Sequence, residues 1–250
     1  MFRVSLLSLR NLALASVALL VGGFALVFFY APNDADQGFI QKIFYLHVPL
    51  ALCALGGFIA AAVHAIRHLR SGDPVHDARA YVSIHISIIF GLAVLVTGSI
   101  WARASWGKWW VWDEPTLVSF LIVFLLYATY YPLRFAIEDR DRQARYASVF
   151  AITAGAFVPL NFIAVRMAES LVHPRTFATA EGGMPGEMWL TFAVAIAGMA
   201  LLWVTLVRFE LMAKSARARI SRVRRALDAE APSAAPSRIA PAVPSRAGAG

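Results

Sequence analysis

"NLALASVALLVGGFALVFFYA", residues 11–31, contains no Asp, Glu, Lys or Arg. A helix needs about 20 mostly apolar residues to cross the hydrocarbon core of a bilayer, so this stretch has the length and composition of a membrane span. Five further stretches have the same character, at about 43–66, 80–100, 116–133, 146–165 and 188–207. The sequence therefore predicts an all-α integral membrane protein with six transmembrane helices.

The composition supports this class. Hydrophobic residues make up 59% of the 250-residue chain and its mean hydropathy is +0.63, whereas soluble domains are about 45–50% apolar. The apolar runs are continuous rather than alternating, which excludes a β-barrel. The first run is longer than the core of a signal peptide and no clear cleavage site follows it, so we expect an uncleaved helix.

Several chemistries are excluded by missing motifs. The single cysteine, Cys53, rules out a disulfide framework and a CxxCH motif for covalent haem attachment. No G-x-x-x-x-G-K-[ST] motif is present, so any ATPase activity must belong to another chain.

The distribution of charge predicts the orientation, because Lys and Arg accumulate in cytoplasmic loops. With both termini cytoplasmic, 18 of the 23 Lys and Arg residues fall on the inner side. The five on the outer face are Lys42, Arg103, Lys108, Arg166 and Arg175. The net charge of +8 then reflects topology and a basic tail, and does not indicate nucleic-acid binding.

Three regions follow along the chain. Residues 1–208 form the six-helix membrane domain. Residues 209–230 are rich in Arg and predict a basic juxtamembrane helix lying on the anionic lipid of the inner leaflet. Residues 231–250 are rich in Ala, Pro and Ser, a composition typical of a disordered tail.

Tryptophan is concentrated in "WARASWGKWWVWDEP", residues 101–115, between the third and fourth predicted helices on the outer face. Five of the seven tryptophans lie here: Trp101, Trp106, Trp109, Trp110 and Trp112. Tryptophan collects at membrane interfaces because its ring is amphipathic, but indoles also stack on flat π systems. The loop is therefore either an interface belt or a surface for a flat apolar ligand.

The end of this stretch has two interpretations as well. Acidic residues and proline both favour the first turn of a helix. Asp113, Glu114 and Pro115 can therefore simply begin the fourth helix. Asp113 can alternatively orient the loop.

Two histidines fall on the same face as the tryptophans. The charge count that places the loop outside also places His47 and His173 there. Imidazole is a common iron ligand, and two of them can bind haem iron from opposite sides, although each histidine also suits a structural role. The outer cations Arg103, Lys108, Arg166 and Arg175 could pair with carboxylates such as haem propionates. His85 lies deeper, towards the inner side, and is expected to pack or to form a hydrogen bond.

A family resemblance rests on three motifs in order. "WGKWWVWD" (106–113) resembles the WWD signature of a haem-handling superfamily that includes CcmC, CcmF and the CcsA-type synthase subunits. "KIFYLHVPLA" (42–51) and "NFIAVRMAESLVHP" (161–174) are similar to the two histidine segments of the cytochrome c maturation protein C (CcmC, haem exporter protein C) family. The similarity covers about residues 40–207. One departure is Glu114-Pro115, where the family usually has Arg-Leu-Thr.

The resemblance implies that haem b binds transiently at the outer face of a bacterial inner membrane. Its axial ligands would be His47 and His173, and its platform the loop containing Trp106, Trp109, Trp110, Trp112 and Asp113. The implied partners are a CcmE-like haem chaperone, which docks on this loop, and ABC-type ATPase and permease subunits. The chain would handle haem without a catalytic site of its own.

Two alternatives stay open. A CcsA-type cytochrome c haem synthase subunit would carry further histidines near the outer face, and none stands out. An ABC-type permease subunit without haem would need a polar path across the bilayer, and the spans are nearly uncharged.

Overall fold

The computed structural model describes residues 8–168, 172–173 and 184–230, and this part of the chain is helical. The elements are α1 (Leu9–Phe29), the 3-10 helix η1 (Phe39–Ile43), α2 (Phe44–Ser71), α3 (Pro74–Trp106), α4 (Pro115–Ala128), α5 (Tyr130–Phe135), α6 (Arg140–Met167) and α7 (Gly186–Glu230). Among the described residues, six stretches are long and apolar enough to cross a membrane, with α4 and α5 together making one of them. The predicted fold class is therefore confirmed, while the orientation of the termini stays a prediction.

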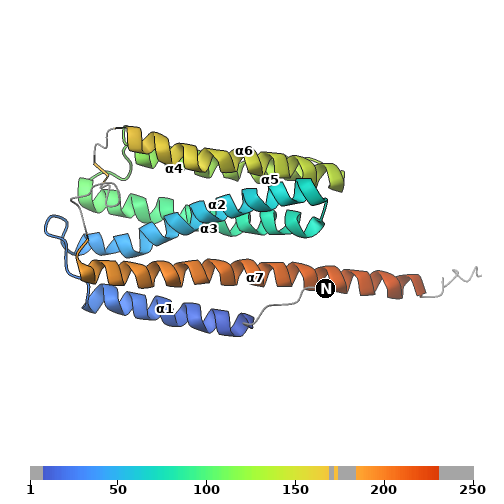
Figure 1. Ribbon diagram of the computed structural model, residues 1–250, viewed down its shortest axis with the longest axis horizontal. Helices are drawn as coiled ribbons and strands as arrows, with labels where there is room; N and C mark the ends of the chain where they lie inside the picture. Colours follow the sequence, from blue (N-terminus) through green and yellow to red (C-terminus); the bar gives the residue numbers. More distant parts are fainter. Residues whose placement is uncertain (1–7, 169–171, 174–183, 231–250) are drawn as a thin grey trace, which may run out of the picture. The chain divides into compact units, whose positions relative to one another are not determined.

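The chain divides into two compact units, Met1–Leu211 and Met212–Gly250. Within the first unit the helices run alongside one another, and α2 and α3 lie between the α4–α6 pair and the α1–α7 pair (Figure 1). The two central helices thus provide the framework on which the outer pairs pack.

The turn between α2 and α3 is encoded by three consecutive residues. Gly72 ends α2 in the left-handed conformation (φ 67°), which glycine adopts without steric cost. The side chain of Asp73 then accepts a hydrogen bond from the backbone N–H of Val75 at 2.8 Å, and Pro74 occupies the first helical position. The connection is therefore short, and α2 and α3 are antiparallel neighbours.

The centre of the first unit is closely packed. The rings of Phe58 and Tyr127 stack with centroids 3.8 Å apart and planes 8° from parallel, and both side chains are fully buried. A Cβ atom added at Gly155 on α6 would lie only 2.4 Å from the Cβ of Ala62 on α2. Glycine at position 155 is what allows these two helices to approach so closely, as small residues do between membrane helices.

The outward faces of the helices are apolar. Large hydrophobic side chains such as Val21, Ile89 and Ile163 are half or more exposed. Contiguous apolar surface of this kind marks a site of contact with a membrane or a partner. On helices that have the length and hydropathy of membrane spans, lipid accounts for it directly.

Two pairs of polar side chains lie at the end of the first unit opposite the α3–α4 loop. Arg134, near the end of α5, donates to both carboxylate oxygens of Asp77 at 2.7 and 2.6 Å and to the hydroxyl of Tyr130 at 2.9 Å. About two turns further along α3, His85 Nδ1 lies 2.7 Å from Glu210 Oε2 on α7. The predicted hydrogen-bonding role of His85 is confirmed. We call this set, Asp77, His85, Arg134 and Glu210, the polar end.

The second unit is helical from Met212 to Glu230, where α7 ends. The cations of this helical stretch are Lys214, Arg217, Arg219, Arg222, Arg224 and Arg225. The boundary predicted at residue 209, and the position of this helix on a membrane surface, stay predictions. The tail predicted at 231–250 lies outside the described residues.

Candidate functional site

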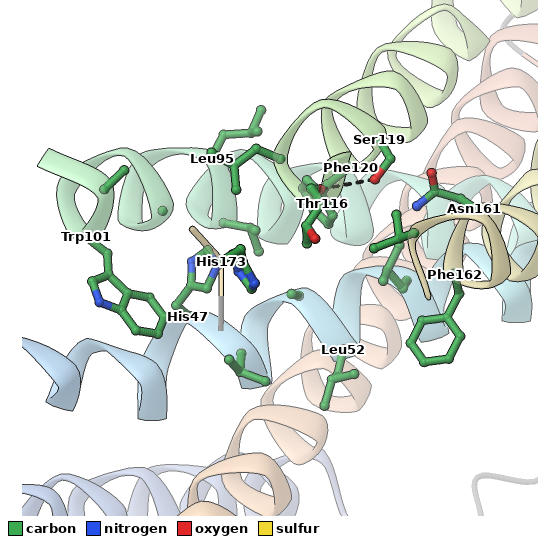
Figure 2. Close-up of a pocket in the computed structure, with 18 of the residues that line it drawn as sticks. His47, Leu52, Leu95, Trp101, Thr116, Ser119, Phe120, Asn161, Phe162 and His173 are labelled. Carbon is green, nitrogen blue, oxygen red and sulfur yellow. Dashed lines mark hydrogen bonds between the residues drawn. The ribbon is translucent and has the colours of Figure 1, made fainter. Parts of the chain in front are cut away.

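A cavity of about 260 Å³ lies where α3 ends and α4 begins, which we call the tryptophan end (Figure 2). Side chains of α2, α3, α4 and α6 line it together with the described segment 172–173. Most of the wall is apolar or aromatic. Its nitrogen-bearing members are His47, Trp101, Trp106, Trp110, Asn161, Arg166 and His173. The cavity therefore brings both predicted histidines to one apolar space.

His47, in the first turn of α2, is held by a hydroxyl on α3. Its Nδ1 lies 2.9 Å from Thr97 Oγ1, and that hydroxyl donates its hydrogen to the carbonyl of Ala93 at 2.8 Å. In the arrangement where that hydrogen stays on the carbonyl, Thr97 Oγ1 is the acceptor and His47 carries its proton on Nδ1. The lone pair of Nε2 is then available for a metal, which is the usual arrangement for a ligating histidine.

The ring of His47 is also confined sterically. A Cβ atom at Gly98 would lie 2.9 Å from His47 Cε1, so glycine is needed where α3 passes the ring. Trp101 meets the ring edge-on, with centroids 5.7 Å apart. Trp101 is itself fixed, because its Nε1 donates to Gln37 Oε1 at 2.7 Å. The orientation of His47 is thus determined by three neighbours on α3.

His173 reaches the cavity from a different part of the chain. Its ring lies near Trp106, with centroids 6.5 Å apart. The backbone N–H groups of Val172 and His173 donate to Glu114 Oε2 at 2.9 and 3.3 Å. The segment carrying this histidine is therefore attached to the loop that precedes α4.

The tryptophans of the loop divide into two groups. Trp106 and Trp110 line the cavity, as does Trp101, which is buried. Trp109 and Trp112 instead expose 61% and 71% of their surface and do not line the cavity. The loop thus has an inner face towards the cavity and an outer face that is open to contact.

The charged residues predicted for the site are divided in the same way. Arg166 lines the cavity, and its guanidinium also lies over the ring of Phe162, 4.5 Å from the centroid. Arg103 donates to the carbonyl of Gly107, which ends α3. Lys108 and Asp113 are exposed and do not line the cavity, and Arg175 lies outside the described residues.

One side of the cavity reaches the outward surface of the spans. Leu52 on α2 and Phe162 on α6 both line it (Figure 2), yet they expose 43% and 54% of their surface. Exposed surface on these helices is lipid-facing if the helices cross a membrane. The cavity therefore extends to the outward surface of the spans at these two residues.

Several residues that line the cavity or hold its histidines were not predicted. Trp101 was noted only as part of the tryptophan cluster, and Thr97 and Asn161 were not assigned to the site. An amide or hydroxyl within an apolar span is a signal that could have identified them, because such groups are placed where a partner or a ligand satisfies them. Phe44 and Phe120 carry no such signal, since they resemble ordinary helix residues.

Comparison with known proteins identifies the family. The family model described as "Heme exporter protein C" matches residues 1–226. The chain belongs to the heme exporter protein C family. It is 32% identical over 218 residues to the heme exporter protein C of Rhodobacter capsulatus (85% of this chain, 90% of the relative). It is 31% identical over 195 residues to that of Paracoccus denitrificans (77% and 80%) and 34% identical over 160 residues to that of Escherichia coli K12 (64% and 65%).

Membership of the heme exporter protein C family, with six apolar helices, makes the chain a multi-pass bacterial membrane protein with a haem-related role in cytochrome c maturation. The donors at the tryptophan end fit a haem. A six-coordinate haem iron takes two axial donors from the protein, and among the described residues no group of three or more His, Cys, Asp and Glu forms a site for a bare metal ion. Two histidines on an apolar, aromatic wall with one arginine match the requirements of haem.

Proposed function

We propose that the chain holds haem b in the cavity at the tryptophan end, with His47 and His173 as the two axial ligands. The observation that carries the proposal is that these histidines, from segments far apart in the sequence, line one apolar cavity. The hydrogen bond from His47 to Thr97 supports it, because it leaves Nε2 as the donor atom. Trp106 and Trp110 supply the flat aromatic wall that a macrocycle requires.

Arg166 is the residue of the wall that suits a propionate. Its guanidinium can form paired hydrogen bonds with a carboxylate. Among the described residues that line the cavity, Arg166 is the one with a permanently charged cationic side chain. Arg175 was predicted for the same role and stays a prediction.

The site faces outward in this proposal. Both termini are cytoplasmic by the distribution of Lys and Arg. With the N-terminus inside, the chain has crossed the membrane three times when it reaches the α3–α4 loop. The loop, and with it the cavity, then lies on the periplasmic side of the inner membrane. Haem held there is in the compartment where c-type cytochromes are completed.

Delivery uses the outer face of the same loop. Trp109 and Trp112 are exposed beside the cavity, and exposed aromatic residues are typical of protein-binding surfaces. A CcmE-like haem chaperone would dock here and take the haem, with ABC-type subunits acting on the loaded complex. The chain supplies ligands and shape, so its function is presentation rather than a chemical step of its own.

The test is the absorption spectrum of the chain purified from membranes. We expect a six-coordinate haem b spectrum that becomes five-coordinate in His47→Gly and in His173→Gly, and that free imidazole restores in both. His85→Gly is the matched control, because His85 also lies within a span but is paired with Glu210, and its spectrum should not change. A folded, colourless wild-type protein that also fails to bind added haem would refute the proposal.

A further inference from the structure

Glu114 is a buried carboxylate at the junction of the tryptophan loop and α4. Its surface is 0% exposed, although its neighbours Trp112 and Asp113 are exposed. It is also the N-cap of α4, because its Oε1 accepts from the N–H of Thr116 at 3.4 Å. A charge removed from solvent in this way is costly unless several hydrogen bonds compensate.

Two of the compensating donors come from the segment that carries His173. Oε2 of Glu114 accepts from the backbone N–H of Val172 at 2.9 Å and of His173 at 3.3 Å, 58 and 59 residues away in the sequence. Hydrogen bonds to a charged acceptor are roughly twice as strong as neutral ones. Glu114 therefore connects the start of α4 to the second histidine through two donors that are adjacent in the chain.

The position of this connection matters for the histidine ring. Backbone atoms of residue 173 are held at Glu114, while the ring lies beside Trp106 at the end of α3. Fixing the main chain on one side and the ring on the other leaves the imidazole at the cavity wall. The same loop also places Trp110 on that wall, so one segment positions both a ligand and part of the aromatic surface.

We propose that Glu114 is the positioning residue of the second haem ligand: its carboxylate holds the backbone of Val172–His173 so that the His173 imidazole faces the cavity. The proposal rests on the proposed function, in which His173 binds the haem iron. Glutamate suits this role better than aspartate or glutamine. Aspartate is one methylene shorter, and glutamine places an amide N–H₂ where one of the backbone donors requires an acceptor.

The first experiment measures, without haem, the hydrogen bonds from the backbone of Val172 and His173 to Glu114. Hydrogen exchange of the peptide containing residues 172–173 is compared between wild-type apoprotein, Glu114→Gln, and Glu187→Gln, an exposed glutamate in the first turn of α7. We expect roughly tenfold faster exchange in Glu114→Gln alone, because the two amides lose their charged acceptor. Equal exchange in all three proteins would overturn the proposal.

The second experiment separates positioning from general destabilisation. Haem affinity should fall roughly ten- to a hundredfold in Glu114→Gln, with a five-coordinate spectrum that retains the His47 ligand. In a His173→Ala background the same substitution should change the remaining affinity by less than about twofold, because its effect passes through that histidine. In a His47→Ala background the loss should persist.

An equal loss in both backgrounds would show that Glu114 does not act through His173, and would overturn the proposal. A wild-type chain that binds no haem would refute the proposed function instead. The exchange measurement is made on apoprotein, so the two failures are distinguishable.

Discussion

The polar end and the tryptophan end of the first unit place a histidine and an arginine in different surroundings. At the polar end, His85 Nδ1 is hydrogen-bonded to the carboxylate of Glu210, and Arg134 makes two short hydrogen bonds to Asp77. At the tryptophan end, His47 uses Nδ1 on a single hydroxyl, that of Thr97, and its ring lines a cavity. Polar groups in apolar surroundings need partners. Where the protein supplies these partners, they stabilise the fold. Where a cavity lies beside the polar group, a ligand can supply the partner.

The arginines show the same contrast. Arg134 exposes only 10% of its side chain and also lies over the ring of Tyr81, 5.2 Å from the centroid. Arg166 forms part of the cavity wall, with the ring of Phe162 beneath its guanidinium. We therefore expect the first arginine to affect folding and the second to affect haem binding.

The largest expected effect is on folding, from Arg134→Ala. Removing one partner of a buried pair leaves Asp77 uncompensated, which should lower the free energy of unfolding by about 3–5 kcal/mol. Denaturant titration in detergent measures this. Arg166→Ala is the counterpart, and should lower haem affinity with little change in stability. If Arg134→Ala instead weakened haem binding in the folded fraction, the contrast between the ends would be wrong.

Thr97→Val should produce the next largest effect. The substitution keeps the side-chain shape but removes the acceptor that fixes the tautomer of His47, so haem affinity should fall about ten- to a hundredfold. Thr153→Val is the control, because Thr153 on α6 makes the same kind of hydrogen bond to the carbonyl four residues earlier without contacting the cavity. Haem titration monitored in the Soret band compares them, and equal affinities would exclude a role for the hydroxyl.

Gly98→Ala should weaken haem binding about tenfold. The new methyl would lie 2.9 Å from His47 Cε1, so the ring must move, and misfits of this kind cost about 1–3 kcal/mol. Gly56→Ala adds the same methyl on α2 where nothing lies within 4 Å and should leave affinity unchanged. An unchanged affinity in Gly98→Ala would mean that the ring of His47 need not occupy the observed position.

The smallest effect on haem binding is expected for Trp109→Ala and Trp112→Ala. Both side chains are exposed, so affinity should change by less than about twofold, while transfer to a CcmE-like chaperone slows. Trp110→Ala, on the cavity side, should instead lower haem affinity and leave the rate of transfer to the chaperone little changed. Stopped-flow transfer assays with haem-loaded protein measure both quantities, and loss of haem from Trp109→Ala would contradict the division of the loop.

The fold could be predicted because its signals are local. Each span is a continuous apolar run, and "SGDP", residues 71–74, marks a helix end and a helix start within four positions. The convergence of His47 and His173 on one end could also be predicted, because loop charge determines which helix ends lie together.

The inner and outer tryptophans could not be separated in advance. After Gly107 ends α3 with φ 71°, the loop has no helical period, so the direction of Trp109 relative to Trp110 depends on local turns. The hydrogen bonds between Glu114 and the segment that carries His173 could not be predicted either. The role of Glu114 as a helix start could be predicted, and the structure confirms it, but the two backbone donors that this residue also binds lie 58 and 59 residues away. The pairing of Arg134 with Asp77 is long-range in the same sense, at 57 residues.

The extension of the cavity to the outward surface of the spans at Leu52 and Phe162 determines how a ligand travels. The buried core around Phe58 and Tyr127 fills the space between the helices beyond the cavity, so a porphyrin cannot pass lengthwise through the bundle without separating packed side chains. An apolar molecule dissolved in the bilayer can instead arrive sideways, between α2 and α6, by diffusion in two dimensions. Such a molecule would exchange lipid for protein without crossing water, so the membrane would be the reservoir for the proposed site.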